Sequence, residues 1–256
     1  MALPGFEVFE FEQAGIRHPV FHRGTGPGVV LMHELPGMTE PCIRLAERIA
    51  DRGFRVYMPL LFGKAGQRAP AGNFFRVCIS REFRIFAGRR SSPVVDWLRA
   101  LSRRAHEECG GPGVGAIGMC LTGNFALGLM VDEHLLAPVA SQPALPIGFG
   151  AAGRRALALE PGELARIKER TEQGARLLGL RFSEDGVCPA ERFARLREEL
   201  GPAFEAVEID SSEGNPHGLP GTAHSVLTDE LVDREGHPTR AALERVLEFL
   251  QSHLEV

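Results

Sequence analysis

The sequence contains no long hydrophobic run. No stretch approaches the ~18 to 20 unbroken apolar residues that a membrane-spanning helix requires. The opening residues MALPGFEVFEFEQ lack the basic start and the long apolar segment of a signal peptide. We therefore expect no membrane partner for this chain and a cytoplasmic location.

Cysteine pairs with functional spacing are also missing. The chain has five cysteines, an odd number, and no two of them are spaced as C-x-x-C. This pattern argues against a disulfide framework and against a structural zinc site. His33 and Glu34 do not begin the zinc motif H-E-x-x-H, because residue 37 is glycine. We expect free thiols, no metal ion and no cofactor.

An excess of positive charge is absent as well. The formal net charge is -4 and the isoelectric point is near 6.2. Basic residues are interleaved with acidic ones, as in RLAERIADR and LARIKER. Such a chain has no broad positive field, so nucleic acid is not an expected partner.

What the sequence does contain is a regular alternation of strand and helix patterns. FEVFEFEQ and RHPVFHRG alternate apolar and polar residues, which predicts two antiparallel edge strands. From GVVLMHE onward, apolar strand patterns are followed by helical patterns as far as TRAALERVLEFLQSHL. This order predicts a single α/β domain over residues 1–256. We expect a mostly parallel central sheet with helices on both faces and a ligand site at the carboxyl ends of the strands.

Two long segments interrupt this alternation. Residues 60–91 are basic and punctuated by glycine, and residues 142–160 run through QPALPIGFGAAGRRALALE. Long loops in compact domains often carry function. We therefore expect both segments to be loops that lie over the active site.

Cys120 stands between Gly118 and Gly123, where the strand pattern VGAIGM meets the helical pattern NFALGLM. A nucleophile on a sharp strand-to-helix turn needs small neighbours, because the backbone there passes close to adjacent elements. The N-terminus of the following helix stabilises a thiolate and a developing oxyanion. On these residues alone, Cys120 fits a nucleophile and a buried structural thiol equally well.

The partners of a nucleophilic cysteine are an acid and then a histidine, each placed after a late strand. Asp185 begins the turn after RLLGLRFSE, and we favour it over the adjacent Glu184 and over Asp210. The loop after FEAVEID carries His217 and His224. We favour His224, because small residues precede it and apolar residues follow it, as expected of a side chain anchored at the edge of the sheet.

These side chains predict three separate catalytic roles. The thiolate of Cys120 attacks a carbonyl, the imidazole transfers protons, and the carboxylate fixes the orientation of the imidazole. Two backbone N–H groups are expected to form the oxyanion hole. One belongs to Leu121, which follows the nucleophile, and the other to Leu35, in the loop after GVVLMHE.

Five ordered pieces of the sequence resemble the dienelactone hydrolase family of α/β-hydrolases: VVLMHELPGM, GFRVYMPLLFG, GMCLTG, EDGVCPAE and GTAHS. The resemblance spans roughly residues 27–250 and implies the α/β-hydrolase fold. It also implies a triad of Cys120, Asp185 and His224. In that family a glutamate, here Glu34, pairs with the resting thiol and releases it when substrate binds.

The chain departs from the family pattern at two positions. Thr122 stands where the family usually has glycine, and its branched side chain is expected to crowd the turn. Thr228 stands where members that cleave dienelactone have an arginine that binds the substrate carboxylate. Arg81 or Arg84 is a candidate for a remaining carboxylate contact.

The sequence thus favours a hydrolase, a monomer or homodimer, that cleaves a small ester or lactone through a cysteine nucleophile. The alternative is a non-catalytic member of the same fold that binds or senses a small molecule. Thr122 and Thr228 support this alternative. A third alternative is a redox-sensing thiol protein, with Cys188 as the candidate second thiol because it follows Asp185 closely in the sequence.

Overall fold

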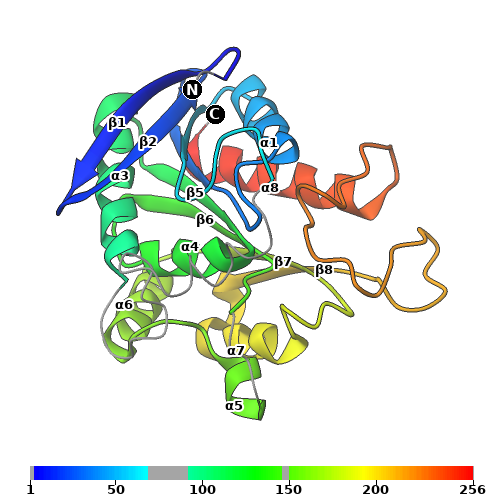
Figure 1. Cartoon of the computed structure of the whole chain (residues 1–256). Coiled ribbons are helices and arrows are strands. Elements are labelled where there is room, and N and C mark those ends of the chain that lie inside the picture. Colours follow the sequence, from blue (N-terminus) through cyan, green and yellow to red (C-terminus); the bar gives the residue numbers. More distant parts are fainter. Residues whose placement is uncertain (1–2, 69–91, 146–149, 256) are drawn as a thin grey trace.

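An eight-stranded sheet runs through the described part of the molecule, with the strand order β1-β2-β4-β3-β5-β6-β7-β8 (Figure 1). The computed structural model describes residues 3–68, 92–145 and 150–255. The strands are β1 Glu7–Gln13, β2 Ile16–Arg23, β3 Gly28–Met32, β4 Arg55–Pro59, β5 Val114–Met119, β6 Leu135–Ser141, β7 Leu177–Phe182 and β8 Phe204–Ile209.

The direction of each strand follows its sequence pattern. β1 and β2 form an antiparallel hairpin, and β2 also runs antiparallel to β4. Ala14 and Gly15 make the hairpin turn and both have a positive φ, as a tight two-residue turn requires. The strands from β4 to β8 in the sheet order pair in parallel, and β3, β5 and β7 are wholly buried. The predicted mixed sheet with an antiparallel edge is confirmed.

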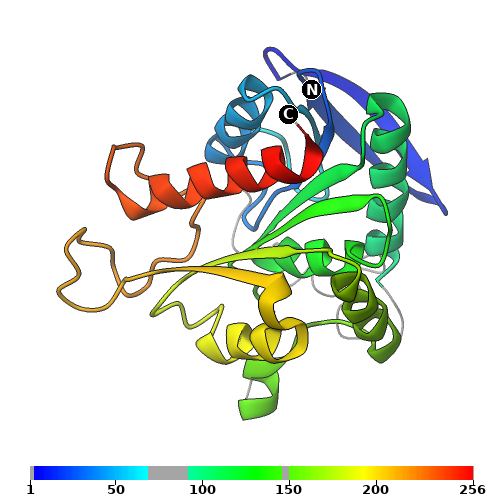
Figure 2. The same ribbon diagram turned by 180° about the vertical axis from the view of Figure 1, so that it is seen from behind.

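Helices cover both faces of the sheet, as predicted (Figures 1 and 2). Buried side chains of α1 and α8 belong to the core on one face, and those of α3, α4, α6 and α7 belong to the core on the other. The helices are α1 Glu40–Asp51, α3 Pro93–Cys109, α4 Gly123–Leu129, α5 Gly150–Arg155, α6 Pro161–Glu172, α7 Ala190–Leu200 and α8 Pro238–Leu254. Two short 3-10 helices, η1 Cys120–Thr122 and η2 Gly201–Ala203, complete the described elements.

The expectation of an unbroken loop over residues 142–160 is wrong in part, because α5 occupies Gly150–Arg155. Its sequence GAAGRR has no apolar stripe and none of its residues is buried, so no helical periodicity marks it. Arg154 and Arg155 instead form ion pairs with Glu191 and Glu198 of α7. Residues 69–91 and 146–149 lie outside the described part, so the prediction that the long segments cover the site stays a prediction.

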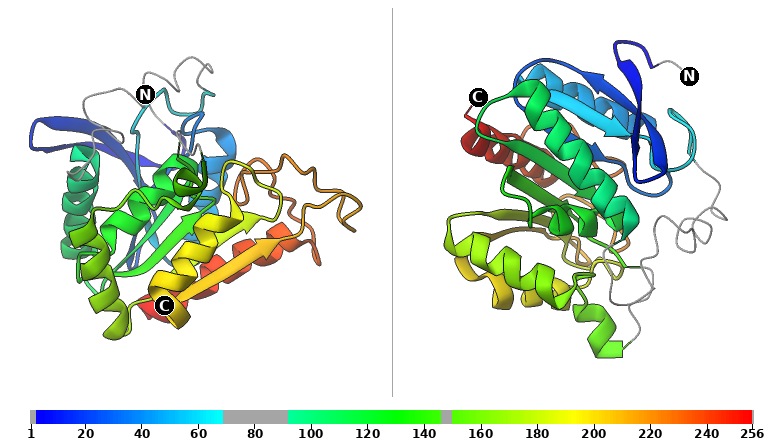
Figure 3. Two further views of the ribbon diagram at one scale, coloured as in Figure 1. Left: turned by 90° about the horizontal axis from the view of Figure 1, so that it is seen from below. Right: turned by 90° about the vertical axis from the view of Figure 1, so that its left-hand side faces the viewer.

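The parallel strands direct their carboxyl ends to one edge of the sheet. The segments that follow β3, β5, β6, β7 and β8 therefore begin near one another, and they contain the residues singled out in the sequence. The segment between β8 and α8, drawn in orange, extends from the end of β8 (Figure 3). Within the described residues, no helix combines the length and the apolar character needed to cross a membrane.

Candidate active site

Cys120 lies at a tight turn between β5 and the helix pair η1 and α4. Its φ of +55° is in the left-handed region, which costs a residue other than glycine about 1–3 kcal/mol. A Cβ atom at Gly118 would lie 2.1 Å from the carbonyl oxygen of Thr122, and one at Gly123 would lie 2.9 Å from the Cα of Pro143. The small residues on either side of Cys120 are thus required by close backbone contacts. The thiol residue itself is 9% exposed.

Thr122 fits this turn through its hydroxyl group. The hydroxyl accepts a hydrogen bond from the Met119 N–H at 2.9 Å. It lies within donating distance of the carbonyl oxygens of Met32, His33 and Met119, at 3.0, 3.3 and 2.9 Å. Thr122 therefore joins the end of β5 to the end of β3, and its side chain is wholly buried. The crowding expected from the branched side chain is offset by these bonds.

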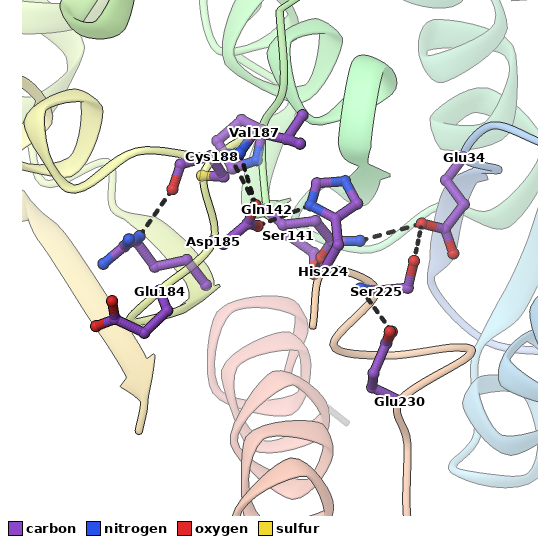
Figure 4. A network of polar contacts seen from close by, with 12 residues as sticks. Glu34, Ser141, Gln142, Glu184, Asp185, Val187, Cys188, His224, Ser225 and Glu230 are labelled. Carbon is purple, nitrogen blue, oxygen red and sulfur yellow. Dashed lines mark hydrogen bonds and ion pairs between the residues drawn. The ribbon is translucent and has the colours of Figure 1, made fainter. Parts of the chain in front are cut away.

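Asp185 and His224 form a close pair, as the order of the sequence led us to expect (Figure 4). The Asp185 Oδ2 atom lies 2.7 Å from His224 Nδ1. The other carboxylate oxygen accepts the N–H groups of Val187 and Cys188 at 2.9 and 3.0 Å. Asp185 is 3% exposed, so its direction toward the imidazole is fixed by the turn in which it lies.

The environment of His224 favours its protonated form. Burial alone lowers the pKa of His224, but the hydrogen bond to Asp185 and the interaction with the Cys120 thiol together raise it to about 10. The Nδ1 atom is engaged by Asp185, while the buried Nε2 atom makes no hydrogen bond with any described residue. Nε2 is therefore the ring atom that remains for proton transfer.

Glu34 lies in the segment after β3 and is 2% exposed. Its carboxylate accepts hydrogen bonds from Ser225 Oγ at 2.7 Å, from Gln142 Nε2 at 3.2 Å and from the Thr228 hydroxyl. Burial raises the pKa of Glu34, and the bonds from Thr228 and Ser225 oppose that rise. Its pairing with the Cys120 thiol stays a prediction.

The two expected oxyanion donors occupy suitable elements. Leu121 is in the first turn of η1, where backbone N–H groups have no partner within the helix. Leu35 is half-buried in the turn after β3, which the Gly37 N–H closes by donating to the Glu34 carbonyl at 2.7 Å. Arg81 and Arg84, the candidates for a substrate carboxylate contact, lie outside the described residues.

Two buried arginines hold the segment that carries Asp185. Arg181, in β7, donates to the carbonyl oxygens of Cys188 and Ser183 at 3.0 and 2.8 Å and pairs with Glu208 at 2.6 Å. We did not predict this role. In LLGLRF, Arg181 has the pattern of an outward-facing strand residue, and the fold of the following loop is what buries it.

Arg192, in α7, connects three loops. It donates to the carbonyl oxygens of Pro143, Ala156 and Val187 at 2.6, 2.9 and 3.3 Å. Burial lowers the pKa of its guanidinium, although the nearby Cys188 and Asp185 raise it. The segment after β6 and the Asp185 turn are thus fastened to the same side chain.

His33 fixes the segment after β3 from the other side. Its Nε2 atom accepts the Leu61 N–H at 3.1 Å, so the proton resides on Nδ1, which is 3.2 Å from the Glu34 carbonyl oxygen. Burial lowers the pKa of His33 to about 4, so the ring is neutral at pH 7. Among the described residues, no group of at least three His, Cys, Asp or Glu side chains has the arrangement of a metal site.

Comparison with known proteins places the chain in a hydrolase family. The sequence profile of the dienelactone hydrolase family matches residues 18–254. A dienelactone hydrolase candidate from Klebsiella pneumoniae superposes with a TM-score of 0.66 at 18% identity, over 96% of this chain and 98% of that one. A dienelactone hydrolase-like promiscuous phosphotriesterase from metagenomic libraries gives 0.65 at 17% identity, over 97% and 98%.

A more distant similarity reaches an esterase from Pyrococcus furiosus. It superposes with a TM-score of 0.62 at 15% identity, over 97% of this chain and 93% of the esterase. At these identities the structural neighbours establish the fold alone. Comparison with curated protein sequences gave no match.

Proposed function

We propose, since the chain belongs to the dienelactone hydrolase family, that it hydrolyses a small ester or lactone through a covalent thioester on Cys120. The observation that carries the proposal is the 2.7 Å pair of Asp185 and His224, together with a cysteine held at positive φ on a strand-to-helix turn, whose thiol contributes to the raised pKa of His224. Nucleophile, base and orienting carboxylate are the three parts that this chemistry needs.

The reaction proceeds in two halves. The Cys120 thiolate adds to the ester carbonyl, and the Leu121 and Leu35 N–H groups bind the resulting oxyanion. When the tetrahedral intermediate collapses, the C–O bond breaks and the imidazolium of His224 gives its proton to the departing alkoxide. A water molecule then gives its proton to the neutral imidazole and attacks the thioester. Collapse of the second intermediate releases the carboxylic acid and restores the thiolate and the imidazolium.

The electrostatics of the site support this cycle. A raised His224 pKa favours an imidazolium next to the sulfur atom, and a neighbouring positive charge stabilises the thiolate, which is the reactive form of cysteine. The Asp185 carboxylate keeps Nδ1 engaged, so Nε2 is the atom that exchanges the proton. No step requires a group other than substrate and water.

Two observations weigh against the alternatives. Thr122 makes hydrogen bonds that hold the turn, so its presence does not argue for a non-catalytic protein. Burial, with the nearby Asp185, raises the pKa of Cys188 to about 12, which disfavours the thiolate that a redox partner would need. These observations leave hydrolysis as the function that fits the site best.

The substrate class follows in part from Thr228. Threonine carries no charge, so this position cannot bind a substrate carboxylate as an arginine would. Its hydroxyl donates to Glu34 instead. We therefore propose that neutral esters and lactones are cleaved in preference to anionic ones of the same size.

The test is turnover of a panel of aryl esters and lactones, neutral and anionic, by the wild type, by Cys120→Ala and by Cys42→Ala. Cys42 is a matched control, because it is a buried free thiol that packs from α1 into the opposite core. We expect Cys120→Ala to abolish turnover and Cys42→Ala to keep it. Unchanged turnover by Cys120→Ala would refute the proposal, and so would alkylation by iodoacetamide that modifies another thiol before Cys120.

A further inference from the structure

Glu34 is the point at which three segments of the chain meet. The residue itself follows β3, Gln142 directly follows β6, and Ser225 and Thr228 belong to the segment after β8 that carries His224. All of these contacts join residues more than a hundred positions apart, since the separations are 108, 191 and 194. Figure 4 shows the Glu34 carboxylate directed toward Ser225 and Gln142.

Both carboxylate oxygens of Glu34 are occupied. The Oε1 atom accepts the Thr228 hydroxyl, and the Oε2 atom accepts the Ser225 hydroxyl and the Gln142 amide. The Ser141 hydroxyl donates to the amide oxygen of Gln142, which leaves the NH₂ group of that amide directed at Glu34. The cluster is buried and its donors and acceptors are matched, so it resists rearrangement.

The cluster acts on the residue next to His224. Ser225 follows His224 directly, and its backbone N–H is held by Glu230 at 2.7 Å while its hydroxyl is held by Glu34. Thr228 fixes the same segment three residues further on. The backbone on the C-terminal side of the imidazole is thereby fastened to the segment after β3, while Asp185 fastens the ring itself.

We propose that Glu34 is a positioning residue for His224, whose carboxyl group clamps the 224–228 segment so that the imidazole stays between Asp185 and Cys120. The inference rests on the proposed function, and it assigns to Glu34 a task that needs no contact with the thiol. A catalytic group displaced by about 1 Å can lose on the order of a hundredfold in rate, so a clamp of this kind matters for kcat.

The role predicts how substitutions at Glu34 rank. Alanine removes all three contacts. Glutamine keeps an oxygen for Ser225 and Gln142, and its NH₂ group donates to the Thr228 hydroxyl, which can accept as well as donate. A clamp therefore survives Glu34→Gln, whereas a role that depends on negative charge beside the thiol does not.

The experiment measures kcat and KM on a neutral aryl ester for Glu34→Ala, Glu34→Gln and Thr228→Val. Thr39→Val is the matched control, because Thr39 is also a buried threonine in the described part but has no hydrogen bond to Glu34. We expect Glu34→Ala and Thr228→Val to lose about tenfold or more in kcat with KM changed less than about twofold. Glu34→Gln is expected to stay within about threefold of the wild type.

A second readout is independent of turnover. The Nδ1 proton shared by His224 and Asp185 is expected as a downfield imidazole resonance in proton NMR spectra of the wild type, Glu34→Gln and Thr39→Val, and as a weakened or missing one in Glu34→Ala. If no ester is hydrolysed, the proposed function fails, and this resonance still decides the positioning role. If Glu34→Ala does not fold, Thr228→Val decides both readouts.

Either of two results would overturn the inference. One is a loss of kcat in Glu34→Gln as large as in Glu34→Ala, which would assign the effect to charge. The other is Glu34→Ala or Thr228→Val with the kcat and the imidazole resonance of the wild type, which would leave Glu34 a structural carboxyl without influence on His224.

Discussion

Replacing Thr122 with valine keeps the shape of the side chain and removes the hydroxyl group that joins β5 to β3. The Met119 N–H then loses its acceptor, and the carbonyl oxygen of Met32 loses a donor. Both groups are in a wholly buried part of the sheet, where water cannot replace the lost partner. Thr122→Ser is the matched variant, because it keeps the hydroxyl and deletes only a methyl group.

The expected cost follows from the two groups. Each buried polar group left without a partner costs about 1–3 kcal/mol, so the two groups together should lower the free energy of unfolding of Thr122→Val by about 2–6 kcal/mol. For a chain of this length, about 2–4 °C of melting temperature are lost per kcal/mol, which gives a decrease of roughly 4–24 °C. Thr122→Ser should cost only about 1 kcal/mol for the methyl group.

Differential scanning calorimetry of the three proteins at one pH measures these differences. We expect the order wild type, Thr122→Ser, Thr122→Val, with the valine variant clearly below the other two. Equal melting temperatures for the serine and valine variants would refute the reasoning, because the hydroxyl group would then contribute nothing to the turn.

Three further predictions concern other parts of the site. Gly118→Ala should destabilise the protein more than Thr122→Val does, since its Cβ would lie 2.1 Å from a carbonyl oxygen, and a melting temperature near that of the wild type would contradict this close contact. His33 has a pKa lowered to about 4, so the unfolded chain binds a proton that the folded one does not, and stability is lost as pH falls from about 6.5 to about 4. Urea unfolding at pH 7 and 4.5 should show a smaller loss for His33→Gln than for the wild type, and equal losses would exclude His33 as the cause. Arg192→Met leaves three carbonyl oxygens without this donor, so we expect a lower melting temperature and a lower esterase kcat. If both values equalled those of the wild type, the three loops would keep their positions without Arg192.

The fold and the order of the site residues could be predicted because their signals are local. A buried parallel strand is a short apolar run, and Cys120 and Asp185 come soon after such runs, while His224 lies in the long segment after β8, a strand that is buried only in part. The ends of parallel strands meet at one edge of the sheet, so order along the chain is enough to bring Asp185 and His224 together. The pairing of Asp185 with His224 at 2.7 Å follows from that rule.

The contacts that hold the site in place, those of Glu34, Arg181 and Arg192, are not marked by any local sequence pattern. The partners of Glu34 are separated from it by 108 to 194 positions, so no motif of a few residues can contain them. Arg181 and Arg192 have the sequence patterns of exposed residues, and they are buried because loops fold over them to accept their hydrogen bonds. Such contacts depend on the exact path of the loops, which composition and periodicity do not specify.

The central claim is that Cys120 forms a thioester with the acyl group of the substrate. Mixing the protein with an aryl acetate, stopping the reaction with acid within the burst and mapping the peptides by mass spectrometry tests it most directly. The account predicts an acetyl group on Cys120 in the wild type and none on the same peptide in Cys120→Ala. Ester hydrolysis without any acyl group on Cys120, or with the acyl group on another residue, would contradict it.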